Sequence, residues 1–124
     1  MLARENRLKK RKSFNYIYRK GRSVGNEYLT LVFVYARGTA KVGFSVSKKV
    51  GNSVIRHRVT RQMRAAMRAL MPQVRVHNSM IFIAKESMKD ISTEVIKDAM
   101  DKALAKAGLK NADMIKGVKA ENSK

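Results

Sequence analysis

Residues 41–71 read KVGFSVSKKVGNSVIRHRVTRQMRAAMRALM, a strand pattern that runs directly into a basic helix pattern. In 41–47 every second residue is apolar and the others are small or polar, which is typical of a half-buried strand. Gly51 ends this stretch, and Asn52 or Ser53 can cap the helix that follows. We therefore expect a strand, a tight glycine turn and a helix in direct succession.

The predicted helix extends to about Met71, because Pro72 cannot continue the helical hydrogen-bond pattern. Its apolar side spans an arc of about 120° on a helical projection and consists of Ile55, Val59, Met63, Ala66, Met67 and Leu70. The opposite side carries His57, Arg58, Arg61, Arg64 and Arg68. Arg56 lies nearer the apolar side, in the first turn. One face is therefore expected to pack on the core and the other to present arginines.

Further strands are predicted on both sides of this unit. Residues 28–36 are apolar on both faces and indicate a central strand. Turn residues separate them from 41–47, so these two strands are expected to pair as an antiparallel hairpin. Residues 80–84, MIFIA, indicate a buried strand. Residues 22–27 allow a fourth strand that the pattern does not define.

A short helix is predicted between Ser13 and Gly21, residue types that often begin and end helices. Phe14, Ile17 and Tyr18 fall on one face of it. The residues alone leave open whether this face packs on the core or contacts a ligand.

A last helix begins near Ser92 or Thr93 and ends at Gly108, with one apolar and one charged side. The resulting order is α-β-β-α-β-α, with room for the fourth strand. It predicts an α+β, two-layer α/β sandwich with helices on one face of a small mixed sheet. We expect residues 1–110 to form a single domain and 111–124 to be a polar, frayed tail.

Charge is the most unusual property of the composition. The 124 residues include 28 Lys and Arg against 9 Asp and Glu, a net charge of +19. Residues 1–68 hold 18 of the basic residues and only two acidic ones. Such a concentration attracts polyanions, above all nucleic acid and secondarily an anionic membrane surface.

Several functional classes are excluded by composition. The absence of cysteine excludes disulfide scaffolds, Cys-ligated zinc and thiol nucleophiles. No apolar run approaches the roughly 20 residues of a membrane span, and the start of the chain turns basic where a signal peptide is apolar. The histidines His57 and His77 form no metal or nucleophile–base spacing, and no Walker-type loop is present. We therefore expect a cytoplasmic protein without catalytic residues, a metal site or a membrane partner.

The segment 48–68 contains seven basic residues and no acidic one. Lys48 and Lys49 stand at the mouth of the predicted helix, where Gly51 allows close approach of a ligand to the backbone. Cations there oppose the helix dipole, which indicates that an anion offsets them. Arginine binds phosphate with two parallel hydrogen bonds, so the arginines extend this site along the helix. The segment predicts an anion-binding surface rather than a solvated charge run.

These motifs resemble the bacterial ribonuclease P protein component. The likeness covers roughly 4–107 and rests on Arg7-Leu8-Lys9-Lys10 with Phe14 and Gly21, on VGFSVSKKVGN at 42–52, and on the arginine helix. The family helix usually reads Arg-Asn-Arg, where this chain has Arg56-His57-Arg58, and usually has a basic residue in place of Thr60. A charged His57 would make RNA binding sensitive to pH.

The resemblance implies a fold like the second domain of ribosomal protein S five, with a left-handed β-α-β crossover around the arginine helix. It implies a protein subunit of ribonuclease P, the endonuclease that matures the 5′ end of tRNA. The partners would be ribonuclease P RNA and precursor tRNA, with no role for DNA. The RNA would perform the hydrolysis with Mg²⁺, and the protein would bind no cofactor and be non-catalytic by itself.

The resemblance also assigns two sets of residues. Contacts with the catalytic RNA would come from Lys48, Lys49, Asn52, Arg56, Arg58, Arg61, Arg64 and Arg68. A cleft for the single-stranded 5′ leader of precursor tRNA would contain Lys9, Lys10, Phe14, Tyr18 and Val32. The aromatic pair would then serve as a stacking platform for bases.

Two other classes of function compete with this one. A ribosomal protein of the same fold would bind ribosomal RNA without any dependence on a leader. A stand-alone nuclease would need catalytic residues that the sequence lacks. A helical DNA-binding regulator would need a helix-turn-helix pair, whereas strand patterns flank the arginine helix.

Overall fold

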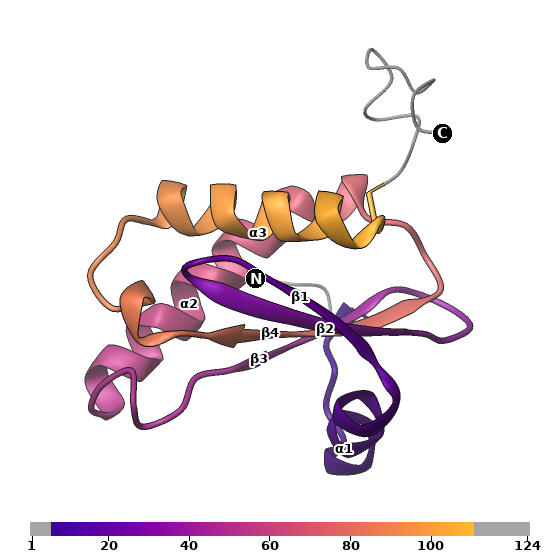
Figure 1. Cartoon of the computed structure of the whole chain (residues 1–124), viewed down its shortest axis with the longest axis horizontal. Coiled ribbons are helices and arrows are strands. Elements are labelled where there is room, and N and C mark those ends of the chain that lie inside the picture. Colours follow the sequence, from indigo (N-terminus) through magenta and orange to yellow (C-terminus); the bar gives the residue numbers. More distant parts are fainter. Residues whose placement is uncertain (1–5, 111–124) are drawn as a thin grey trace.

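The computed structural model describes residues 6–110 and contains one four-stranded sheet and three α-helices (Figure 1). The elements are α1 (Arg11–Lys20), β1 (Arg22–Gly25), β2 (Leu29–Tyr35), β3 (Lys41–Ser45), α2 (Ser53–Leu70), β4 (Asn78–Ala84) and α3 (Thr93–Ala107). Short 3-10 turns at Met71–Gln73 and Glu86–Met88 flank β4. The α+β class is confirmed, and β1 is the fourth strand that the sequence left undefined. The predicted tail at 111–124 lies outside the described residues.

The strands are arranged in the order β1-β2-β4-β3. β2 pairs antiparallel with β1 and with β4, whereas β3 pairs parallel with β4. The predicted hairpin of β2 with β3 is therefore wrong, because β4 lies between them. Met80, Ile81 and Phe82 of β4 are completely buried, and only a central strand has apolar cover on both faces.

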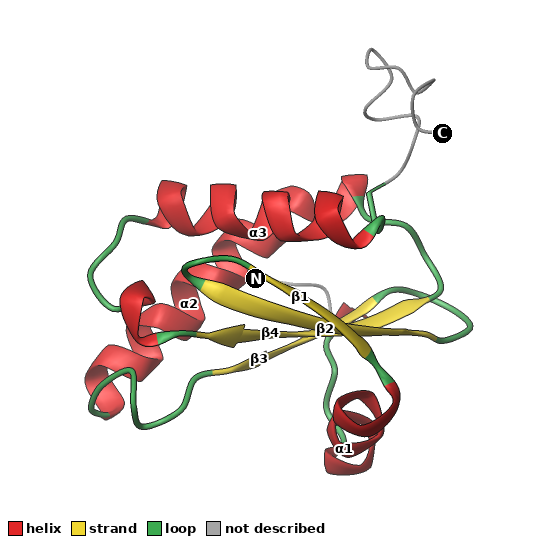
Figure 2. Ribbon diagram, in the orientation of Figure 1, coloured by secondary structure: helices red, strands yellow, loops and turns green. Residues whose placement is uncertain are grey.

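Helices cover both faces of the sheet (Figure 2). α2 and α3 pack on one face over the main core, which includes Met63, Phe82 and Met100. On the other face α1 places Ile17 against Val32 and Ile81. The expectation that all helices lie on one face is thus wrong for α1, because alternate residues of β2 and β4 make the second face apolar too.

Two of the three α-helices begin at a capping residue that the sequence predicts. Asn52 Oδ1 accepts a hydrogen bond from Ile55 N–H at 3.0 Å, and Ser92 Oγ accepts one from Val95 N–H at 3.2 Å. α1 instead begins after Lys10, without a side-chain cap. Gly21 is required for close packing rather than for a left-handed turn, because a Cβ there would lie 2.5 Å from the Ile17 carbonyl oxygen.

Within residues 6–110, none of the helices combines the length and apolar character that a membrane crossing requires.

Candidate nucleic-acid interface

The turn between β3 and α2 presents two lysines on an ordered backbone. Lys48 and Lys49 are exposed, whereas the next residue, Val50, is buried in the core. The Val50 N–H donates to the Ser47 carbonyl oxygen at 3.1 Å, and the Lys49 N–H donates to Ser47 Oγ at 3.3 Å. The buried Val50 and the hydrogen bonds to Ser47 therefore hold the turn in place, and Lys48 and Lys49 stay exposed to solvent.

Asn52 and Arg56 stabilise the start of α2. Asn52 Oδ1 is used by the helix cap. Arg56 is half-buried, and its Nε donates to the Gly51 carbonyl oxygen at 3.1 Å. Both predicted RNA-contact residues therefore hold the backbone of the turn in place.

The remaining arginines of α2 divide into two groups. Arg61, Arg64 and Arg68 are exposed along the helix. Arg58 lies on the side facing the segment before α3, where it donates to the Lys89 carbonyl oxygen and lies 3.9 Å from Asp90 Oδ1. On a helical projection Arg58 is about 120° from Arg64. Arg58 and Arg64 therefore lie on different sides of α2, and we call Arg61, Arg64 and Arg68 the arginine row.

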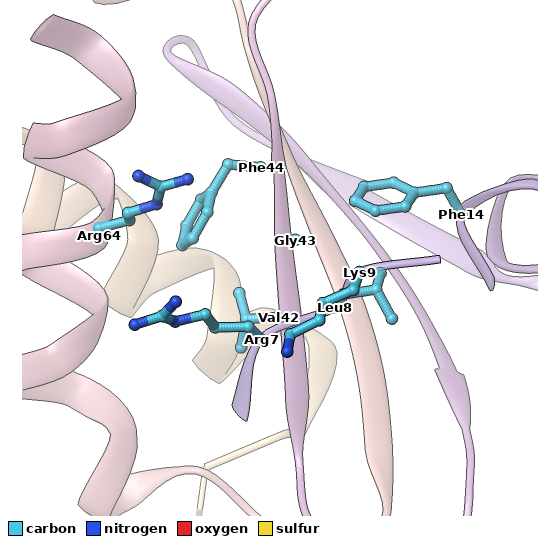
Figure 3. A pocket seen from close by; sticks show the side chains of 8 residues that line it. All are labelled: Arg7, Leu8, Lys9, Phe14, Val42, Gly43, Phe44 and Arg64. Carbon is cyan, nitrogen blue, oxygen red and sulfur yellow. The ribbon is translucent and has the colours of Figure 1, made fainter. Parts of the chain in front are cut away.

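A hollow of about 290 Å³ wraps around the outer edge of β3 (Figure 3). Its lining comes from the segment before α1, from α1 itself, from β3 and from α2: Arg7, Leu8, Lys9, Phe14, Val42, Gly43, Phe44 and Arg64. In Figure 3, Phe14 lies on one side of the β3 ribbon, with Arg7 and Arg64 on the other. Two of the predicted leader residues, Lys9 and Phe14, thus share this space with one predicted catalytic-RNA residue.

The segment before α1 is held against β3 by backbone pairing. Leu8 N–H donates to the Val42 carbonyl oxygen at 2.9 Å, and Asn6 Nδ2 donates to the Ala40 carbonyl oxygen at 2.8 Å. Arg7 forms a parallel bridge with Val42. This short addition to the sheet fixes the segment before α1 at the edge of β3, where it shares the hollow with Arg64 of α2.

Gly43 allows the Phe14 ring to lie directly on β3. A Cβ at Gly43 would lie 2.6 Å from Phe14 Cζ and 3.1 Å from Leu8 Cδ2. A larger residue would therefore force the ring away from the strand. The alternating pattern of 41–47 predicts Gly43 on the small, polar face of the strand but carries no sign of its contact with Phe14.

The two exposed tyrosines of α1 lie on different sides of the helix. Tyr18 is 45% exposed and follows Phe14 by four residues, which places both on one side. Tyr16 is 47% exposed and borders a separate hollow with Val34. Lys10 is exposed immediately before the helix.

Val32 does not reach the surface of this site. It is only 8% exposed and belongs to the small core beneath α1. Val32 lies on the sheet face beneath α1, where Ile17 packs against it, and its assignment to the leader cleft stays a prediction. Arg7, Leu8, Gly43 and Phe44 are lining residues that sequence analysis did not assign. The basic run at 7–12 and the small face of β3 were the available signals.

Positive charge dominates the candidate interface. From Tyr28 to Lys85 the sequence contains no acidic residue. Asp90, beside Arg58, is the acid paired with α2 in the described part of the chain. No group of three or more His, Cys, Asp or Glu side chains suited to a metal ion occurs among residues 6–110.

Comparison with known proteins connects this arrangement with one family. The family model described as Ribonuclease P matches residues 2–108. The ribonuclease P protein component of Clostridium botulinum (strain Langeland) is 37% identical over 110 residues, which are 87% of this chain and 99% of that protein. The corresponding protein of Alkaliphilus metalliredigens is 38% identical over 96 residues, 77% of this chain and 86% of that one. The solved structure of the Staphylococcus aureus RNase P protein superimposes with a TM-score of 0.78 at 30% identity, over 86% of this chain and 98% of the other.

Proposed function

This chain belongs to the family of bacterial ribonuclease P protein components, and we propose that it helps a catalytic RNA remove the 5′ leader of precursor tRNA. It is then one component of an endoribonuclease holoenzyme. In this proposal the RNA subunit performs the hydrolysis with its own Mg²⁺ in the cytoplasm. The protein contributes affinity and orientation for the two RNAs.

The hollow at β3 is the observation that carries the proposal. It places the Phe14 ring, Lys9 and Arg64 around one space. A base of single-stranded RNA can stack on Phe14 with Lys9 beside it, and such a stack contributes about 1–3 kcal/mol. Arg64 lies across the β3 ribbon, where it can contact a neighbouring RNA segment. The leader and the catalytic RNA therefore meet at neighbouring parts of one surface.

We assign the catalytic RNA to the exposed cations of the turn and of α2. Lys48 and Lys49 would contact phosphates at the turn, and Arg61, Arg64 and Arg68 would continue these contacts along the helix. Asn52, Arg56 and Arg58 support this surface through their protein contacts, by capping α2 and by bonding Gly51 and Lys89.

We assign the leader to one side of α1. Phe14 and Tyr18 offer aromatic faces there, and Lys9 and Lys10 supply positive charge at the start of the helix. Val32 contributes indirectly, because it packs with the Ile17 side chain of α1 and so helps to set the position of α1.

Reconstitution with a bacterial ribonuclease P RNA tests this function. Cleavage of precursor tRNA is timed at low Mg²⁺, with and without the protein, on substrates with a long or a very short leader. We expect the protein to stimulate cleavage, and to stimulate the long-leader substrate more. Replacing Tyr18 by Ala should reduce the advantage of the long leader by up to about tenfold.

Tyr16→Ala is the matched control. Tyr16 lies on the same helix as Tyr18 and is nearly as exposed, but it lies on the side of α1 away from Phe14. It should leave the leader advantage intact. Equal losses in both variants would remove the assignment of the leader to the Phe14 side. Tight RNA binding without any stimulation would favour a ribosomal RNA-binding protein, and cleavage without added RNA would refute a non-catalytic role.

A further inference from the structure

The end of the sheet farthest from the β3–α2 turn carries an aromatic surface that the proposed function does not use. β3 begins at Lys41 beside this end and finishes at Ser45 before the turn (Figure 1). Tyr35 is 70% exposed at the end of β2, and its ring centroid lies 6.2 Å from that of His77. Val76, next to His77, is 57% exposed. We call the pair of rings the Tyr35–His77 platform.

The His77 half of the platform is held in place by hydrogen bonds to the loop that follows β2. His77 has a φ of 67°, a left-handed conformation that few residues other than glycine adopt. Its N–H donates to the Gly38 carbonyl oxygen at 3.0 Å, and its carbonyl oxygen accepts from Ala36 N–H at 2.9 Å. The Gly38 N–H donates to His77 Nδ1 at 3.0 Å, which leaves Nε2 to carry the proton of the neutral ring. An uncommon conformation that several bonds enforce is typical of a functional position.

The surroundings of the platform are cationic. Arg37 follows Tyr35 by two residues and Arg75 precedes His77 by two, and both are exposed. Arg75 donates to the Gly108 carbonyl oxygen at 3.3 Å, a neutral partner, and it forms no ion pair with an acid of residues 6–110. A second copy of the chain is a poor occupant, since both copies carry +19. Exposed rings flanked by arginines match an unpaired base with its phosphates.

We propose that the Tyr35–His77 platform is a second RNA contact, which stacks one unpaired base and pairs its phosphates with Arg37 and Arg75. It rests on the proposed function only in taking RNA as the partner. Because the His77 ring is already held by its bond to Gly38, little conformational entropy of that ring is lost on binding. An RNA bound along α2 would then be held at both ends of the sheet.

The absence of tryptophan allows a direct test in the full chain. Tyr35→Trp introduces a single tryptophan at the platform, which can be excited selectively over the tyrosines, and Val95→Trp introduces one on the solvent side of α3 as a control. Both proteins are titrated with a 12-nucleotide oligoadenylate at low salt, while the anisotropy of a labelled copy of the oligonucleotide reports binding. We expect quenching in the Tyr35→Trp protein and none in the Val95→Trp protein.

Affinity provides a second measurement. Tyr35→Ala should weaken oligoadenylate binding by about tenfold, whereas Tyr35→Phe, which keeps the ring, should bind normally. Because Tyr35 is mostly exposed, neither change should lower the melting temperature.

Three outcomes would overturn the proposal that the Tyr35–His77 platform binds RNA. They are binding without quenching at position 35, equal quenching at both positions, and a fluorescence change that depends on protein concentration without RNA. The first two leave the proposed function intact, provided the reconstituted cleavage depends on the leader. A chain that binds no RNA at all would refute both proposals.

Discussion

At the scale of single residues, Gly43 determines where the leader side of α1 can lie. The absence of a side chain lets the Phe14 ring rest on β3 and border the hollow. The ring belongs to a flexible side chain, so an added methyl group would move it without breaking the sheet. Gly43, the smallest residue of β3, therefore supports the stacking function that we assign to Phe14 of α1.

We predict that Gly43→Ala reduces the preference for a long leader by up to about tenfold, because the displaced Phe14 ring no longer stacks well. Overpacking should lower the free energy of unfolding by roughly 1–3 kcal/mol. The comparison of long-leader and short-leader cleavage measures the first effect, and urea unfolding measures the second.

A double-mutant cycle distinguishes this mechanism from general damage to β3. In a Phe14→Ala background, where no ring remains to be displaced, Gly43→Ala should cause no further loss of leader preference. Additive losses would show that Gly43 acts on the leader by a route other than Phe14.

At the scale of elements, α2 presents two functionally different basic sides. Arg58 contacts the segment before α3 through the Lys89 carbonyl oxygen and Asp90, and its side chain is 44% exposed. Arg64 borders the hollow instead. A helix that appears uniformly basic in sequence therefore uses one arginine for tertiary structure and another for the proposed RNA contact.

We predict that Arg64→Ala weakens binding of ribonuclease P RNA and lowers the slope of log K against log salt by about one phosphate contact. Its melting temperature should stay unchanged. Arg58→Ala should instead lower the free energy of unfolding by up to about 1 kcal/mol and leave the salt slope unchanged. Filter binding over a salt series and thermal unfolding measure the two quantities.

Arg→Lys versions of both variants provide the control for charge alone. Arg64→Lys keeps one positive charge and should retain most of the salt slope. If Arg58→Ala lowered the salt slope as much as Arg64→Ala, the division of α2 into two sides would be wrong.

At the scale of the whole molecule, the charge of +19 opposes the compact fold while favouring RNA. Added KCl screens repulsion among the basic residues, so stability should increase from 0.05 to 0.5 M KCl. We predict a rise in melting temperature of about 5 °C, equivalent to about 1 kcal/mol for a domain of this size. RNA affinity should fall over the same range. A melting temperature that falls together with the affinity would contradict this account.

Local patterns predicted most elements but not their pairing. The apolar period of α2 and the Asn52 and Ser92 caps follow from neighbouring residues, so the sequence identified them directly. Which strand lies between β2 and β3 depends on long-range burial of β4, and the turn residues between β2 and β3 carry no information about it. The basic site was predictable from charge, whereas the cover of Val32 and the partners of Arg58 depend on how distant elements pack.

The central position of β4 also has a consequence for synthesis of the chain on the ribosome. β2 and β3 share no hydrogen-bonded edge, so the sheet cannot close until residues up to Ala84 have emerged. By then the ribosome has already made every residue of the arginine row and nearly all of the excess charge. Pairing across such sequence separations is slow. The nascent chain therefore passes through a stage that is strongly basic but not yet folded, beside the RNA of the ribosome that is making it.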